Sequence, residues 1–113
     1  MEKWIRVVAG VSGAMAIGFA AYGAHGVDGQ AAEWIEKGSR YQLIHAAVLL
    51  APIYQGRWAK FAAMLFVNGT ILFSGSLYAM ALTGSHSPAV PIGGMFFILG
   101  WVSLAVSSLR SEP

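Results

Sequence analysis

The chain has 113 residues, enough for one domain and too few for two. Hydrophobic residues make up 57% of it and charged residues only 11%, whereas soluble domains carry about 25% charged residues. This composition excludes an ordinary soluble domain, and a net charge of +2 is too small to indicate nucleic acid as a partner. The absence of cysteine from the sequence excludes disulfides, thiolate metal sites and a cysteine nucleophile.

The first apolar stretch covers residues 5–24. A transmembrane helix needs about 20 predominantly apolar residues, so this stretch predicts a first span. A secretory signal peptide, cleaved near Ala16, is the competing interpretation. The apolar core of a signal peptide usually has only about 7–15 residues, so the length of this stretch favours a span.

Residues 29–40 predict an amphipathic helix at the membrane surface. Its apolar face carries Trp34 and Ile35. The opposite face carries its charged residues, which are Glu33, Glu36, Lys37 and Arg40. Their four-residue spacing predicts the ion pairs Glu33–Lys37 and Glu36–Arg40. We expect this helix to bend at Gly38-Ser39 into a second span over residues 41–56.

Two further apolar stretches, residues 61–83 and 91–109, predict the third and fourth spans. The segment Gly84-Ser85-His86-Ser87-Pro88 between them is typical of a turn, and Pro91 stands where a helix start tolerates proline. The sequence therefore predicts an all-α membrane protein. Its single domain, residues 1–113, is a four-transmembrane-helix bundle with an amphipathic helix before the second span.

Basic residues predict the orientation of this bundle, because the short cytoplasmic loops of membrane proteins are rich in Lys and Arg. Five of them fall on the side that holds both termini: Lys3, Arg6, Arg57, Lys60 and Arg110. The opposite side holds Lys37 and Arg40 beside three acidic residues. We therefore expect both termini in the cytoplasm and the amphipathic helix on the extracytoplasmic side. Aromatic residues, Trp101 among them, are expected near the membrane interfaces.

Small residues predict where the helices pack, because close backbone approach favours association between helices in lipid. In the first and fourth spans these residues are Gly10, Ala14, Gly18, Gly93 and Gly100. We expect them to form packing faces within one chain, with an interface between two copies as the alternative.

Polar residues from three of the spans are predicted to lie at a similar depth near the extracytoplasmic face. They are His25, Tyr41, Gln42, His45, Ser74, Ser76 and Tyr78. Two interpretations stay open: the residues join the helices by hydrogen bonds, or they form a site for a ligand or partner. Haem ligation by His25 and His45 is a further hypothesis, without a supporting motif.

Charged residues are missing from the core of every predicted span, whereas proton-coupled transporters usually carry a carboxylate there. The sequence also has no phosphate-binding glycine loop, catalytic triad order or zinc motif. We therefore expect a non-enzymatic protein, without metal or cofactor, that binds a membrane partner or a lipid- or quinone-type ligand. Membrane lipids, a larger membrane complex and a second copy of the chain are the expected partners. The alternatives are a small dimeric transporter or channel for a neutral solute, and a haem or redox protein.

Four motifs in order carry a resemblance to a known family. They are Gly23-Ala24-His25-Gly26, then Tyr41-Gln42-Leu43-Ile44-His45-Ala46, then Leu72-Phe73-Ser74-Gly75-Ser76-Leu77-Tyr78, then Pro91-Ile92-Gly93-Gly94 with Gly100-Trp101. This order resembles the domain-of-unknown-function 423 family, and the likeness extends from residue 23 to residue 101. The resemblance implies a four-span protein of the bacterial inner membrane and no established activity. It also points to the same polar residues as the argument from depth.

Overall fold

The chain folds into four α-helices joined by short loops, as a computed structural model of residues 2–110 describes it. The helices are α1 (Glu2–His25), α2 (Gly29–Leu49), α3 (Arg57–Thr83) and α4 (Ala89–Arg110). The described residues contain no strand, so the prediction of an all-α protein is confirmed. The side chain of Arg110, one of the five basic residues in the orientation argument, lies outside the described part.

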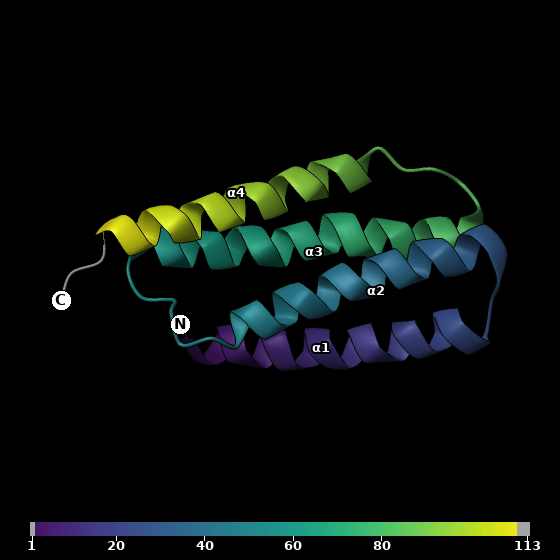
Figure 1. Ribbon diagram of the computed structural model, residues 1–113, viewed down its shortest axis with the longest axis horizontal. Coiled ribbons are helices and arrows are strands. Elements are labelled where there is room, and N and C mark those ends of the chain that lie inside the picture. Colours follow the sequence, from purple (N-terminus) through teal and green to yellow (C-terminus); the bar gives the residue numbers. More distant parts are fainter. Residues whose placement is uncertain (1, 111–113) are drawn as a thin grey trace.

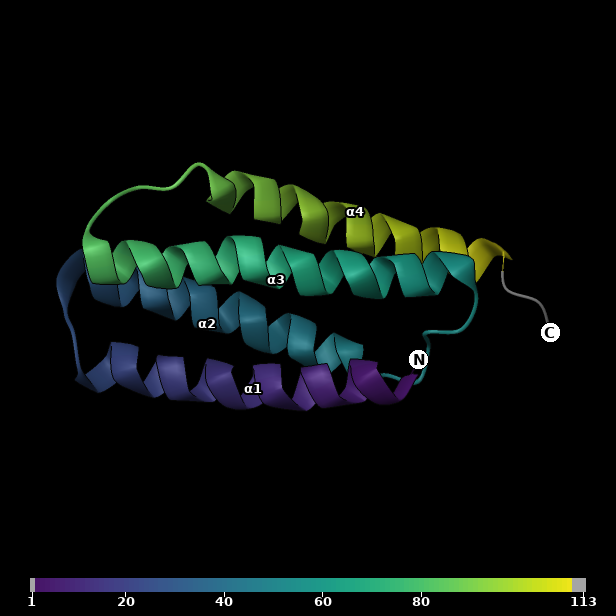
Figure 2. The same cartoon turned by 180° about the vertical axis from the view of Figure 1, so that it is seen from behind.

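The helices lie side by side in chain order (Figures 1 and 2). α1 packs on α2, α2 on α3 and α3 on α4, in a body that measures 50 × 25 × 17 Å. Successive helices are antiparallel, so α1 and α3 run in the same direction and both termini lie at one end. The result is a puckered layer with α2 and α3 inside and with α1 and α4 at opposite edges.

Three of these helices are long and apolar enough to cross a membrane, namely α1 from Lys3, α3, and α4 as far as Leu109. Their outer surfaces expose large apolar side chains such as Ile17, Ile71 and Ile98, as a surface in contact with lipid would. α2 is not among the three candidate spans of the described chain, because four charged residues lower its hydropathy. The count of four spans therefore stays a prediction.

The structure corrects the predicted bend in the second helical region. α2 runs without interruption through Gly38-Ser39. Gly38 does not end the helix because it is buried against α3, where it allows a close approach. A Cβ added at Gly38 would lie 3.0 Å from the ring of Tyr78 and 3.4 Å from the carbonyl oxygen of Ser74.

α2 also ends earlier than the predicted second span, at Leu49 instead of residue 56. Pro52 follows closely, and proline restricts the residue before it and cannot donate to the helix. Tyr54 closes the loop: its hydroxyl donates to the carbonyl of Val48 at 2.9 Å, and burial raises its pKa to about 12. It joins an apolar core near the termini that consists of Ile5, Ala9, Leu49, Tyr54, Ala59, Ala62, Ala63, Phe66 and Phe97.

Two of the predicted packing glycines lie at the contact between α3 and α4. A Cβ added at Gly93 would collide with the backbone of Phe73, and one added at Gly100 would lie 2.6 Å from the ring of Phe66. A side chain at Gly93 would force the two helices apart, and one at Gly100 would displace the buried ring of Phe66. The close approach of α4 to α3 therefore requires glycine at both positions.

The structure corrects the packing prediction for the first span. Gly10, Ala14 and Gly18 are exposed, and a Cβ added at either glycine would meet no atom within 4 Å. The arc of α1 that faces α2 instead contains Ala16, which is 1% exposed, and Gly13, next to Ala46. The stripe of Gly10, Ala14 and Gly18 is thus turned away from the rest of the chain.

Candidate functional site

Gln42 of α2 joins three helices near the middle of the layer. It is 3% exposed, and its Nε2 donates to Ser12 Oγ of α1 at 3.1 Å. Its Oε1 accepts a hydrogen bond from the Tyr78 hydroxyl of α3 at 2.6 Å. Phe19 of α1 stacks on the Tyr78 ring with centroids 3.8 Å apart, which fixes the phenol in place. One amide, with its donor and acceptor ends, therefore connects both neighbours of α2.

His45, one turn before the end of α2, faces α4. The indole Nε1 of Trp101 donates to His45 Nε2 at 3.1 Å, and His45 Nδ1 lies 2.7 Å from the carbonyl oxygen of Tyr41. The imidazole stacks on Phe97 at 3.8 Å and lies 5.1 Å from the ring of Phe66. An aromatic cluster from α3 and α4 thus encloses the ring.

These contacts assign the protonation of His45. An indole N–H can only donate, so Nε2 must accept with its lone pair. A carbonyl oxygen can only accept, so Nδ1 must carry the hydrogen. His45 is therefore neutral in this arrangement and has no lone pair left for a haem iron. The haem hypothesis would require the bond to Trp101 to break.

Ser74 of α3 forms the third contact between helices. Its side chain is fully buried, and its hydroxyl donates to the carbonyl of Gly38 at 2.7 Å. Gly38 lets the two backbones approach closely enough for this short side chain to reach across. The contacts between helices thus lie at successive levels along α2, at Gly38, Gln42 and His45.

The structure brings four of the seven predicted site residues into these contacts, namely Gln42, His45, Ser74 and Tyr78. Tyr41 contributes only its carbonyl to His45, while its ring packs edge-on against Phe73. His25 is exposed at the end of α1, and Ser76 is half-buried on α3, away from this network.

The network also lies farther than predicted from the end of the bundle opposite the termini. Ser12 lies midway along α1, and Gln42 lies beside it. His45 is nearer the end of the layer that holds the termini. The expected place of Gln42 and His45 near the end of the bundle opposite the termini is thus corrected, because α2 already starts at Gly29 and residues 41–45 fall in its second half.

Sequence reasoning missed two members of the network. Ser12 is a single hydrogen-bonding residue among apolar neighbours in α1. This isolated polar position was the signal from which its role in the network could have been predicted. Trp101 was expected near a membrane interface, but the structure places it midway along α4, with its indole directed at His45. The only signal for it was its place at the end of the family motif.

A groove of about 270 Å³ opens between α1 and α3, and the Gln42 network forms its floor. Its walls are Val8, Val11 and Met15 of α1 and Val67, Ile71 and Gly75 of α3. Its polar residues are Ser12, Gln42, Thr70, Ser74 and Tyr78. Gln42 and Tyr78 thus line a groove as a ligand site would require, whereas His45 lies outside it.

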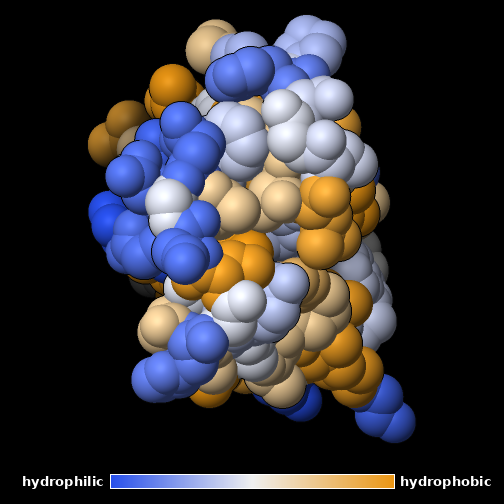
Figure 3. Space-filling model, turned by 90° about the vertical axis from the view of Figure 1, so that its right-hand side faces the viewer, coloured by the Kyte–Doolittle hydropathy of each residue, from blue (hydrophilic) through white to orange (hydrophobic). Residues whose placement is uncertain are grey.

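A second and larger groove, of about 640 Å³, lies between the second half of α1 and the first half of α2. The α1 wall is uncharged and includes Ala20 and Gly23, whereas the α2 wall carries Glu33, Glu36, Lys37 and Arg40. Figure 3 views this end of the molecule and shows hydrophilic residues gathered on one flank, beside apolar surface. The groove is therefore amphipathic.

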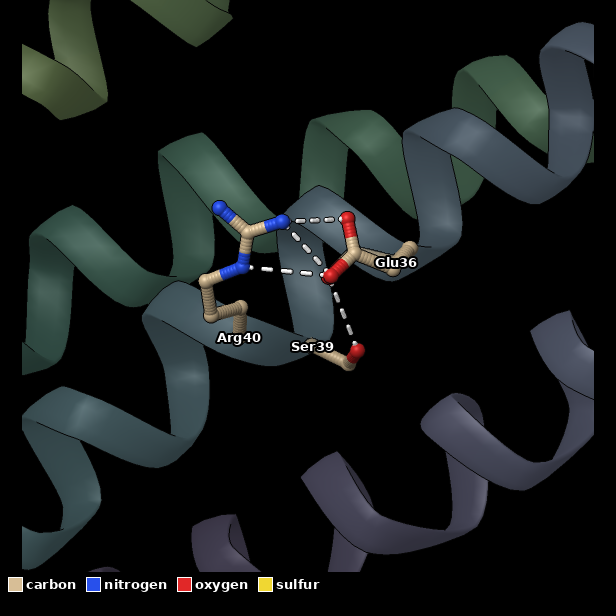
Figure 4. A network of polar contacts seen from close by, with 3 residues as sticks. All are labelled: Glu36, Ser39 and Arg40. Atoms are coloured by element: carbon tan, nitrogen blue, oxygen red, sulfur yellow. Dashed lines mark hydrogen bonds and ion pairs between the residues drawn. The ribbon is translucent and has the colours of Figure 1, made fainter.

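One of the two predicted ion pairs forms on this charged wall. The Arg40 guanidinium binds the Glu36 carboxylate through Nε at 3.1 Å and Nη2 at 2.6 Å (Figure 4). Ser39 Oγ donates to the Glu36 carbonyl at 3.1 Å. Within the described residues, Glu33 and Lys37 do not form the second pair. The described part of the chain also contains no cluster of three His, Cys, Asp or Glu suited to a metal ion.

Comparisons with known proteins give the family. The sequence model of a family described as a protein of unknown function, DUF423, matches residues 19–94. A UPF0382 membrane protein of Haemophilus influenzae is 36% identical over 98% of this chain and 97% of its own length. The UPF0382 inner membrane protein YgdD of Escherichia coli K12 is 34% identical over 96% of this chain and 92% of its own.

A UPF0382 membrane protein of Staphylococcus aureus is also 34% identical, over 96% of this chain and 97% of its own length. No solved structure matches the chain significantly. The matches cover nearly the whole length of relatives that are named membrane proteins, in agreement with the apolar helices described above. The chain belongs to the DUF423 family of membrane proteins.

Proposed function

We propose that the chain spans the bacterial cytoplasmic membrane four times, with both termini in the cytoplasm. The parallel direction of α1 and α3 supports this topology, because the chain must return across the membrane between them. α2 makes this return and has 21 residues, about 31 Å at 1.5 Å per residue, which matches the hydrocarbon thickness. Lys3, Arg6, Arg57 and Lys60 all lie at the end that holds the termini, in keeping with a cytoplasmic position.

We further propose that the protein is non-enzymatic and binds a lipid- or quinone-type molecule in the groove between α1 and α3. The observation that carries this proposal is the combination of apolar walls with a buried hydrogen-bonded floor of Ser12, Gln42 and Tyr78. Ligand sites commonly combine a mostly apolar lining with a few placed polar groups. The walls suit an acyl or isoprenoid chain.

Ser12 supplies the polar contact in this proposal. Its oxygen accepts from Gln42, and in the described part of the chain its own hydroxyl donates to no other group. A hydroxyl has one donor and two acceptor lone pairs, so the Ser12 O–H is available to a carbonyl oxygen in the groove. The best fit is a molecule with a ketone or ester carbonyl on a long apolar chain.

Native mass spectrometry after gentle extraction from the membrane tests this proposal. Wild-type protein is expected to carry a co-purified mass that fragmentation identifies as a lipid or quinone. Gly75→Leu is the informative variant, because Gly75 lines the groove and an added Cβ there meets no atom within 4 Å. The leucine would occupy the groove, and its Cβ would meet no other atom, so it is expected to remove the bound mass while the hydrogen bonds of the network stay in place.

Gly10→Leu is the matched control. Gly10 is equally open, but it lies outside the groove, so this variant should keep the ligand. Wild-type protein without any bound mass, or equal retention by both variants, would contradict the proposed site. If the co-purified mass is a protein instead of a small molecule, the chain binds a membrane protein partner and not a lipid- or quinone-type ligand.

A dimeric transporter or channel for a neutral solute is the second candidate, and one observation favours it. The stripe of Gly10, Ala14 and Gly18 is exposed on α1, where a second copy could approach closely. The same spectra test this candidate. A wild-type dimer that Gly10→Leu converts to a monomer would support it, and a wild-type monomer would count against it.

A further inference from the structure

The groove between α1 and α2 differs chemically from the proposed α1–α3 site. Four charged side chains line its α2 wall at positions 33, 36, 37 and 40, a spacing that puts them on one side of the helix. Their order is acidic, acidic, basic, basic. The four formal charges cancel, but they are separated along the helix axis by about 10 Å from Glu33 to Arg40.

Packing between α1 and α2 sets the depth of these charges. Gly23 packs against Ile35, where an added Cβ would lie 2.9 Å from the isoleucine side chain. α1 and α2 are antiparallel (Figure 1), so the contacts of Gly23 with Ile35 and of Gly13 with Ala46 put Arg40 at about the level of Gly18 along the layer. That level is seven residues inside the end of α1 at His25, or about 10 Å. In the proposed topology, the acidic pair lies nearer the membrane surface and the basic pair lies deeper.

Charged side chains at such a depth require partners, because lipid solvates them poorly. Arg40 has one in Glu36, although more than half of each side chain stays exposed. Lys37 has no ion pair among the described residues and lines the groove beside Arg40. An anionic group in the groove would satisfy Lys37.

We propose that the α1–α2 groove binds a phospholipid with a phosphoethanolamine headgroup from the extracytoplasmic leaflet. Such a headgroup carries its positive ammonium at the outer end and its negative phosphate between the ammonium and the acyl chains, so each of its charges faces the opposite charge on α2. The ammonium lies at Glu33 and the phosphate at Lys37. The acyl chains continue inward over Ala16, Ile17 and Leu43, which line the deeper part of the groove.

Net charge favours this headgroup over an anionic one. Glu33 and Glu36 would repel a headgroup with a net negative charge, whereas a zwitterion meets an opposite charge at each end. Small residues on the α1 wall, Ala20 and Gly23, leave the space that the headgroup occupies. An ammonium with hydrogens can also donate to Glu33, which a quaternary ammonium cannot do.

Competitive lipid binding to the purified protein in detergent micelles tests this proposal. Phosphatidylethanolamine, phosphatidylglycerol and phosphatidylcholine with identical acyl chains are added in equal amounts, and native mass spectrometry counts the bound lipids. Wild-type protein is expected to bind phosphatidylethanolamine preferentially. Lys37→Gln is expected to weaken that binding about fivefold, the effect of one basic residue near a membrane surface.

Three controls keep the test specific. Lys60→Gln removes a lysine at the opposite end of the layer and should leave lipid preference unchanged. Gly75→Leu fills the other groove and should also leave it unchanged, which separates this site from the α1–α3 site. The double variant Glu33→Lys with Lys37→Glu keeps the composition but exchanges the two charges that would meet the ammonium and the phosphate, and it should lose the preference.

Equal binding of the three lipids would overturn the proposal, and so would an equal loss in Lys37→Gln and Lys60→Gln. Preference for phosphatidylglycerol would overturn it in favour of an anionic-lipid site. The inference rests on the proposed orientation for its choice of leaflet. Binding in micelles does not depend on orientation, so a wrong topology and a wrong headgroup would give separate results.

Discussion

The part of α2 up to Arg40 carries four charged side chains at its surface, whereas the part that follows, its second half, carries two uncharged polar side chains that are almost fully buried. Glu36 and Arg40 pair with each other on one helix and stay more than half exposed. Gln42 and His45 are each 3% exposed and bond to other helices. Only two residues, about half a turn of helix, separate Arg40 of the first arrangement from Gln42 of the second.

The difference shows how one helix can meet two requirements in a membrane. Exposed charges near a membrane surface can be satisfied by headgroups and water, so their partners need not come from the fold. Polar groups buried between helices cannot reach headgroups or water, so they must form hydrogen bonds with neighbouring helices. Substitutions in the second half should therefore affect stability more than substitutions in the first half.

His45→Ala should give the largest loss of stability. It removes two hydrogen bonds and the stack on Phe97, and it leaves a cavity among aromatic rings, so a cost of about 2–4 kcal/mol is expected. Reversible unfolding in mixed micelles, followed by circular dichroism, measures it. Ile44→Ala is the control, because Ile44 is 42% exposed and should tolerate the change. Equal stability of the two variants, with ligand lost only from His45→Ala, would mean that His45 serves binding instead.

Gln42→Leu should cost less, about 1–2 kcal/mol, because leucine fills the space but leaves the Tyr78 hydroxyl and Ser12 without their partner. The same unfolding assay measures it. A double-mutant cycle with Tyr78→Phe isolates the bond between the two side chains. Additive effects would show that the 2.6 Å contact contributes nothing to stability.

Trp101→Phe should have a smaller effect, about 1 kcal/mol or less, because it keeps an aromatic ring and loses only the N–H that donates to His45. The change should also release His45 Nε2. Nitrogen chemical shifts of the imidazole in labelled protein would report this release. An unchanged His45 spectrum would contradict the assigned tautomer.

The double variant Glu36→Gln with Arg40→Gln should have the smallest effect. The pair is exposed, so its attraction is screened and its loss should change stability less than any substitution above. The difference from wild type should shrink further at high salt. A loss as large as that of Gln42→Leu would break the distinction between the two halves of α2.

The sequence was sufficient to predict three of the four helices and part of the hydrogen-bond network. Apolar stretches of span length predict α1, α3 and α4, because length and composition alone decide whether a helix can cross lipid. Shared depth and helical spacing also grouped Gln42, Ser74 and Tyr78, which do join α2 to α3. The family motifs contained all three residues.

The rotation of each helix about its own axis could not be predicted in the same way. In a membrane both the packed face and the lipid face are apolar, so composition does not separate them. The stripe at Gly10 and Gly18 therefore looked like a packing face, although the structure turns it outward. For the same reason, Trp101 gave no indication that it reaches His45 across the layer. Gly38 looked like a joint because a glycine's role depends on what lies opposite it.

The crossing of the membrane by α2 is the central claim, because both halves of the comparison depend on it. The chain has no cysteine, so single cysteines can be introduced without background. We would place them at Gln30, near the start of α2, and at Gln55, in the loop after it, and label intact cells with a membrane-impermeant maleimide. The account predicts that Gln30→Cys is labelled in intact cells and Gln55→Cys only after lysis. Labelling of both cysteines from the same side would contradict it.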